Sequence, residues 1–82
     1  AEDPQVAPVL ERVTRRRIEY VATLYGELGL TSAAAHRRAL LAVSVYVGHT
    51  QIARTAPDAL PSTPAQWRLH LDDMVEMLIP TT

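Results

Sequence analysis

Three histidines, two neighbouring aspartates and a run of arginines are the side chains of this 82-residue chain best suited to chemistry. If residues 64–79 form a helix, His70 and Asp73 stand one turn apart on it, as two ligands of one metal ion would. His49 belongs to another helical segment that could pack beside them. These ligands are few and form no repeated motif, so we predict no metal site and no cofactor. We expect His49 and His70 to lie at an interface, hydrogen-bonded, and His36 to be exposed.

Catalytic residues are not indicated elsewhere in the sequence. Asp72 and Asp73 are adjacent, so on a helix their carboxylates point about 100° apart, which is poor geometry for paired acid–base chemistry. The chain shows no Ser-His-acid spacing and no glycine-rich phosphate loop, and it contains only three glycines. We therefore predict that it is not an enzyme.

The stretch VTRRRIEYV places Arg15, Arg16 and Arg17 side by side. Successive helical residues point about 100° apart, so three adjacent arginines cannot share one face of a helix. Arg15 is four residues from both Glu11 and Glu19 and can pair with either, while Arg16 points toward solvent. Because these charges are splayed and partly neutralised, we do not expect a nucleic-acid surface here.

Arg17 differs from its neighbours because it falls at the centre of an apolar stripe. Its aliphatic stem could cover apolar surface while the guanidinium reaches an acid or a helix C-terminus. Alternatively, it could be a pocket arginine that pairs with an anionic ligand. The residues of this stripe, which share one face of the predicted helix, are Leu10, Val13, Val21, Leu24 and Leu28.

Charge and hydropathy bound the remaining classes of function. The net charge of −1 provides no whole-domain attraction to nucleic acid or anionic membranes. No apolar run approaches the roughly 18 residues needed to cross a bilayer, and the acidic start AEDPQVAP lacks the apolar core of a secretory signal. With no cysteine present, these features favour a cytoplasmic protein without membrane association.

The hydrophobic periodicity and the helix-end signals predict an all-α, antiparallel three-helix fragment. Residues 1–8 read as an irregular lead-in with two prolines, and Gly29 and Thr31 suit the end of one helix and the N-cap of the next. Thr63 followed by Pro64 is a strong helix-start signal. The three helices are expected at about residues 9–29, 32–54 and 64–79, forming a single domain over residues 1–82.

The second predicted helix carries more apolar surface than two companion helices can cover. Residues 39–47, ALLAVSVYV, contain one polar side chain, Ser44. A helix that is apolar all round must be buried on more than one side, which indicates a second copy of the chain or a missing part of a larger protein. The surface predicted for this contact comprises Leu41, Val45, Gly48, Ile52, Trp67, His70, Leu71, Met74 and Leu78.

Helix ends and composition together resemble a known family. The pieces LYGELGL, TSAAAHRRALLAVSVYVG, RTAPDALPS, TPAQW and MVEMLI resemble the C-terminal regulatory domain of TetR-type (tetracycline-repressor-like) transcription regulators. The resemblance covers about residues 9–79 and rests on helix ends and composition, since none of these pieces is a catalytic signature. It implies that the last two helices form a four-helix bundle with a symmetry mate.

The same resemblance implies dimerisation and effector sensing as the function. The first helix would contribute one wall of a small-molecule pocket, with Arg17, Tyr20 and Val21 as ligand-facing candidates. DNA binding would depend on an N-terminal helix-turn-helix domain, which these residues do not contain. The alternative is a stand-alone helical protein-interaction module that uses the same apolar surface for a different partner.

Overall fold

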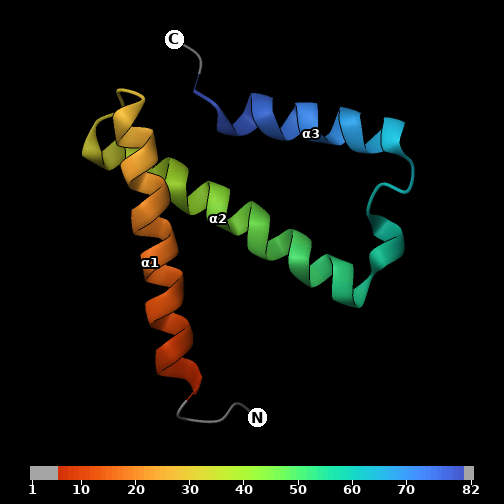
Figure 1. Ribbon diagram of the computed structural model, residues 1–82, viewed down its shortest axis with the longest axis horizontal. Coiled ribbons are helices and arrows are strands. Elements are labelled where there is room, and N and C mark those ends of the chain that lie inside the picture. The colour runs from red at the N-terminus through yellow and green to blue at the C-terminus, as the bar shows by residue number, and fades with distance from the viewer. Residues whose placement is uncertain (1–5, 81–82) are drawn as a thin grey trace. The chain divides into compact units, whose positions relative to one another are not determined.

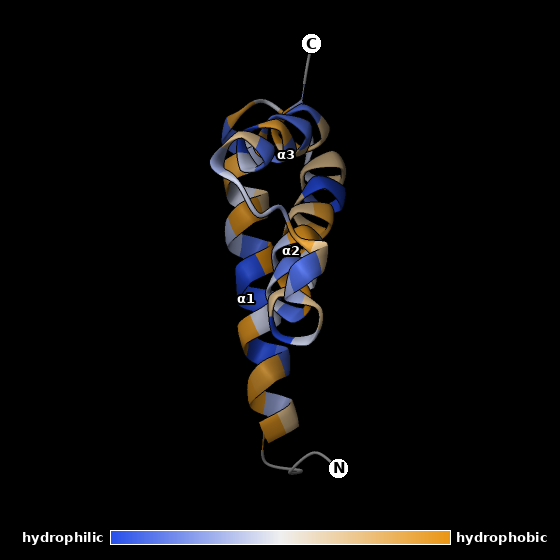
Figure 2. Ribbon diagram, turned by 90° about the vertical axis from the view of Figure 1, so that its right-hand side faces the viewer, coloured by the Kyte–Doolittle hydropathy of each residue, from blue (hydrophilic) through white to orange (hydrophobic). Residues whose placement is uncertain are grey.

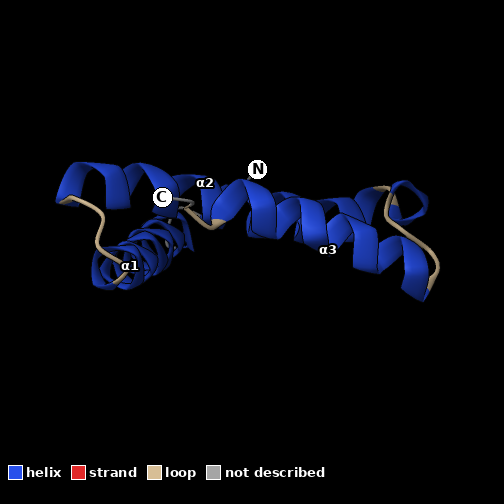
Figure 3. Ribbon diagram, turned by 90° about the horizontal axis from the view of Figure 1, so that it is seen from above, coloured by secondary structure: helices blue, strands red, loops and turns tan. Residues whose placement is uncertain are grey.

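The computed structural model describes residues 6–80, and the regular structure in this range is entirely helical (Figures 1 and 3). The predicted all-α fold with three long helices is therefore confirmed, with one additional turn of 3-10 helix. Residues 1–5, most of the predicted irregular lead-in, lie outside the described residues. The elements are α1 (Val6–Glu27), α2 (Ser32–Thr55), η1 (Pro57–Ala59) and α3 (Pro64–Leu78).

Helix α1 begins three residues earlier than the sequence pattern predicted. It starts at Val6, so Pro8 lies in the first helical turn. The first four N–H groups of a helix have no acceptor within the helix, and proline therefore loses no hydrogen bond at such a position. The prediction that residues 6–8 belong to an irregular lead-in was wrong for this reason.

Gly29 ends the first helix in a left-handed conformation. Its φ is 104°, in a region that glycine enters without steric cost from a Cβ atom. The Leu30 N–H donates to the Tyr25 carbonyl over 3.3 Å, and the Gly29 N–H donates to the Gly26 carbonyl over 3.0 Å. This is a Schellman motif, and it satisfies carbonyl groups that the end of the helix would leave unpaired.

Helices α2 and α3 each begin with a side-chain cap, as predicted. The Ala34 N–H donates to the Thr31 hydroxyl over 3.2 Å at the start of α2. At α3, the Gln66 N–H donates to the Thr63 hydroxyl over 3.2 Å, and the Gln66 side-chain carbonyl accepts from the Thr63 N–H over 3.4 Å. With Pro64 following the cap, this reciprocal capping box starts α3 immediately after the loop.

The chain divides into two compact units, and the boundary between them falls between Val43 and Ser44, within α2. The first unit contains α1 and the first part of α2, and its core cluster consists of Tyr25, Ala35 and Ala39. The small alanines of α2 leave room for the Tyr25 ring at this contact. The hydrophobic side chains that pack against this cluster are Ile18, Val21, Ala22, Leu30 and Ala42.

Helix α1 consequently buries a different face from the predicted apolar stripe. Only Val21 of that stripe packs against the core cluster. The contact is instead centred on Ile18 and Tyr25, which lie on a neighbouring face of the helix. The four remaining members of the stripe are exposed large hydrophobic residues, namely Leu10, Val13, Leu24 and Leu28.

The second unit contains the rest of α2, η1 and α3. The buried hydrophobic residues of the described chain are Tyr25, Ala35, Ala39 and Val43, so none of them belongs to this unit. Figure 2 shows apolar residues along each of the three helices, and many of their side chains are exposed. Within its described residues, the second unit has apolar surface without a closed core of its own.

Candidate functional site

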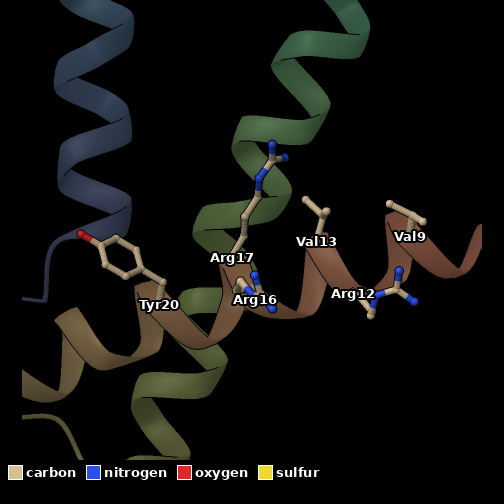
Figure 4. A pocket seen from close by; sticks show the side chains of 6 residues that line it. All are labelled: Val9, Arg12, Val13, Arg16, Arg17 and Tyr20. Atoms are coloured by element: carbon tan, nitrogen blue, oxygen red, sulfur yellow. The ribbon is translucent and has the colours of Figure 1, made fainter. Parts of the chain in front are cut away.

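A groove on α1 brings together residues that suit an anionic, partly apolar ligand (Figure 4). Its volume is about 470 Å³. In the close view, Val9, Val13 and Arg17 project from the same side of the helix. The complete set of lining residues is Val9, Arg12, Val13, Arg16, Arg17 and Tyr20.

The arginines of α1 differ in what surrounds them. The Arg15 guanidinium forms an ion pair with the Glu11 carboxylate over 3.1 Å, as the four-residue spacing predicted. Arg12, Arg16 and Arg17 line the groove, and none of its six lining residues is acidic. Arg12 and Arg16 are four residues apart and therefore lie on one face of the helix. The four-residue spacing of Arg12 and Arg16 is visible in the sequence. The run of three adjacent arginines, residues 15–17, does not include Arg12, so it gave no sign that Arg12 and Arg16 share a face.

Two of the three ligand-facing candidates line the groove. Arg17 does so together with Tyr20, whose side chain is exposed. Val21 packs instead against the core cluster of the first unit. The groove thus combines guanidinium groups, one phenol ring and two valine side chains on consecutive turns of a single helix.

The residues predicted for the dimer contact are partly or largely exposed in the single chain. On α2, the side chains of Leu41 and Ile52 are 53% and 37% exposed, and Leu71 on α3 is also exposed. The remaining predicted contact residues are of intermediate burial, namely Val45, Gly48, Trp67, His70, Met74 and Leu78. The predicted contact residues therefore leave apolar surface that a partner could cover.

A histidine pair links α2 to α3 inside the second unit. The Nε2 atoms of His49 and His70 lie 2.8 Å apart, and His49 Nδ1 lies 2.7 Å from the carbonyl oxygen of Val45. A carbonyl can only accept, so His49 Nδ1 carries the proton and donates to it. In neutral His49 the Nε2 atom then has a lone pair, and it accepts a hydrogen bond from the His70 Nε2–H.

Aromatic and polar groups surround this pair. The rings of Trp67 and His70 meet edge to face, with centroids 5.8 Å apart. The two histidines also line a groove that includes Asp73 and Gln66. Both rings are partly buried. The expectation that His49 and His70 are hydrogen-bonded is confirmed, because the two side chains bond to each other.

In the described range, no three histidine, cysteine, aspartate or glutamate side chains gather as a metal-binding group. No helix in that range has the length and apolar character to span a membrane. The chain matched no family model, no curated protein and no solved structure.

Proposed function

We propose that this chain is the dimerisation and effector-sensing portion of a TetR-like transcription regulator. The observation that carries the proposal is the apolar surface of α2, which buries Val43 within the first unit and yet exposes Leu41 at 53% and Ile52 at 37%. A helix with apolar residues on several sides needs cover on several sides. A second copy that packs its α2 and α3 against these residues would provide this cover with a symmetric contact.

The groove on α1 is the proposed effector site. Three arginines around Val9, Val13 and Tyr20 favour a ligand with an anionic head and an apolar body. Guanidinium groups hold carboxylate or phosphate by paired hydrogen bonds, and the valines remove apolar surface of the ligand from water. Binding that favours one position of α1 would shift the population between two dimer states, which DNA-binding domains outside these residues would detect.

Sedimentation of purified chains tests the dimer. The wild-type chain should sediment as a dimer, and Leu41→Glu should weaken association at least about tenfold, because it places two carboxylates in an apolar contact. Leu40→Glu is the matched control, because Leu40 is 50% exposed on the same helix but outside the predicted contact. A monomeric wild-type chain, or equal weakening by both variants, contradicts the proposed interface.

A stand-alone interaction module is the second candidate, and it uses the same exposed side chains of α2 and α3. This function predicts a folded monomer that associates with a different protein. The apolar surface of α2 and α3 would then be complementary to that partner and not to a second copy of the chain. The same sedimentation experiment separates the two functions. A dimer sensitive to Leu41→Glu supports the regulator domain, and a stable monomer supports the interaction module.

A further inference from the structure

We propose that His49 and His70 form a two-histidine binding site for a divalent transition metal ion such as Zn²⁺, which would join α2 to α3 within one chain. The Nε2 atoms of the two rings converge from different helices to 2.8 Å. Imidazole nitrogen is a preferred ligand of Zn²⁺, Cu²⁺ and Ni²⁺. The metal ion would replace the proton that the two nitrogens share, and water molecules would complete its coordination.

The geometry requires a small separation and a turn of the rings. With zinc–nitrogen bonds of about 2.0–2.1 Å and a tetrahedral angle, two ligating nitrogens lie about 3.3 Å apart. The observed 2.8 Å would have to increase by roughly 0.5 Å, and the rings would have to turn until both Nε2 lone pairs meet at the ion. Both rings are of intermediate burial, so solvent can reach the site.

His49 already has the tautomer that a metal ligand needs. Its Nδ1–H donates to the Val45 carbonyl over 2.7 Å, which orients the ring and leaves the Nε2 lone pair directed at His70. Metal-ligating histidines commonly donate their second ring N–H to a carbonyl in this way. His70 would transfer its Nε2 proton to Nδ1 through water, so the neutral pair binds the ion without net loss of a proton.

The surroundings of the pair are compatible with a cation. Asp73 is the acidic side chain that lines the same groove, and Gln66 adds an amide. The aromatic edge of Trp67 packs against His70 and limits the rotation of its ring. The site thus has two nitrogen ligands held by separate helices, with a carboxylate on the adjoining surface of the groove.

Zinc titration of the full chain by calorimetry tests the site. We expect one Zn²⁺ per chain, and binding at least about tenfold weaker in His49→Gln and in His70→Gln, because loss of a ligand should exceed the effect of losing an outer hydrogen bond. Glutamine keeps a polar side chain, and circular dichroism verifies that each variant is folded. His36→Gln, which changes an exposed histidine of α2, should bind as the wild type does.

Other outcomes overturn the inference. These are no Zn²⁺ binding at millimolar concentration, binding that survives both glutamine variants, equal loss in His36→Gln, or one ion per two chains. Both ligands come from one chain, although His70 also belongs to the predicted dimer contact. Leu41→Glu, which should weaken the dimer, should therefore still bind one Zn²⁺ per chain. Loss of zinc binding in this variant overturns the inference and leaves the proposed dimer standing, so the two proposals can fail separately.

Discussion

His49 and His70 share a hydrogen bond between their Nε2 atoms, 2.8 Å apart, and this bond needs a lone pair on one of the two nitrogens. When neither ring carries an extra proton, His49 accepts and His70 donates. The bond thus joins α2 to α3 through one donor and one acceptor.

The histidine pair should contribute to the stability of the second unit. His70→Ala removes the donor and leaves His49 Nε2 without this hydrogen bond, so the free energy of unfolding should fall by about 1 kcal/mol. The fluorescence of Trp67 and the denaturation midpoint report the change.

His36→Ala is the matched control for this effect, because His36 is an exposed histidine of α2. It should leave the denaturation midpoint nearly unchanged. Equal losses in His36→Ala and His70→Ala would show that the bond between the two helices does not contribute to stability.

The capping box at Thr63 should contribute measurably to stability. Thr63→Ala removes the hydroxyl that accepts the Gln66 N–H, and we expect a loss of about 1 kcal/mol in the free energy of unfolding. Thr23→Ala is a matched control, since the Thr23 hydroxyl donates to the Glu19 carbonyl within α1 and caps no helix. Alanine there should be neutral or slightly stabilising. Urea unfolding of both variants decides, and equal losses would count against the capping role.

Gly48 should distinguish folding from dimerisation. A Cβ atom added at Gly48 meets nothing within 4 Å in the single chain, so Gly48→Ala should favour helix by about 0.5–1 kcal/mol. In the proposed dimer the same methyl group would stand between closely packed helices and weaken association. Gly26→Ala, also in open space and outside the contact, should leave association unchanged. Equal dimer constants for the two variants in sedimentation would exclude Gly48 from the interface.

The α1 groove should bind an amphipathic anion through its arginines. With decanoate as the probe, Arg17→Ala should weaken binding by about fivefold, the upper range for an ion pair that remains exposed to water. Arg15→Ala should change little, because Arg15 pairs with Glu11 and does not line the groove. Isothermal titration measures both. An equal effect of the two substitutions would assign the binding to general positive charge.

The sequence by itself determined the number of helices and most of their ends. Gly29, Thr31 and the pair Thr63–Pro64 were predicted as helix-end signals and act as such in the structure. These signals can be read along the chain because a cap or a left-handed glycine acts on N–H and carbonyl groups only a few residues away. The error at Pro8 had the same local origin, since a proline that breaks a helix interior is tolerated in a first turn.

Only the tertiary structure decided which faces of the helices meet. The stripe through Leu10 and Leu24 is the more apolar face by sequence, but the structure buries the face around Ile18 and Tyr25. The choice depends on the shape of the partner, where Ala35 and Ala39 make space for a tyrosine ring. The pairing of His49 with His70, 21 residues apart, likewise depends on how two helices pack, and the spacing of residues along the chain does not contain that information.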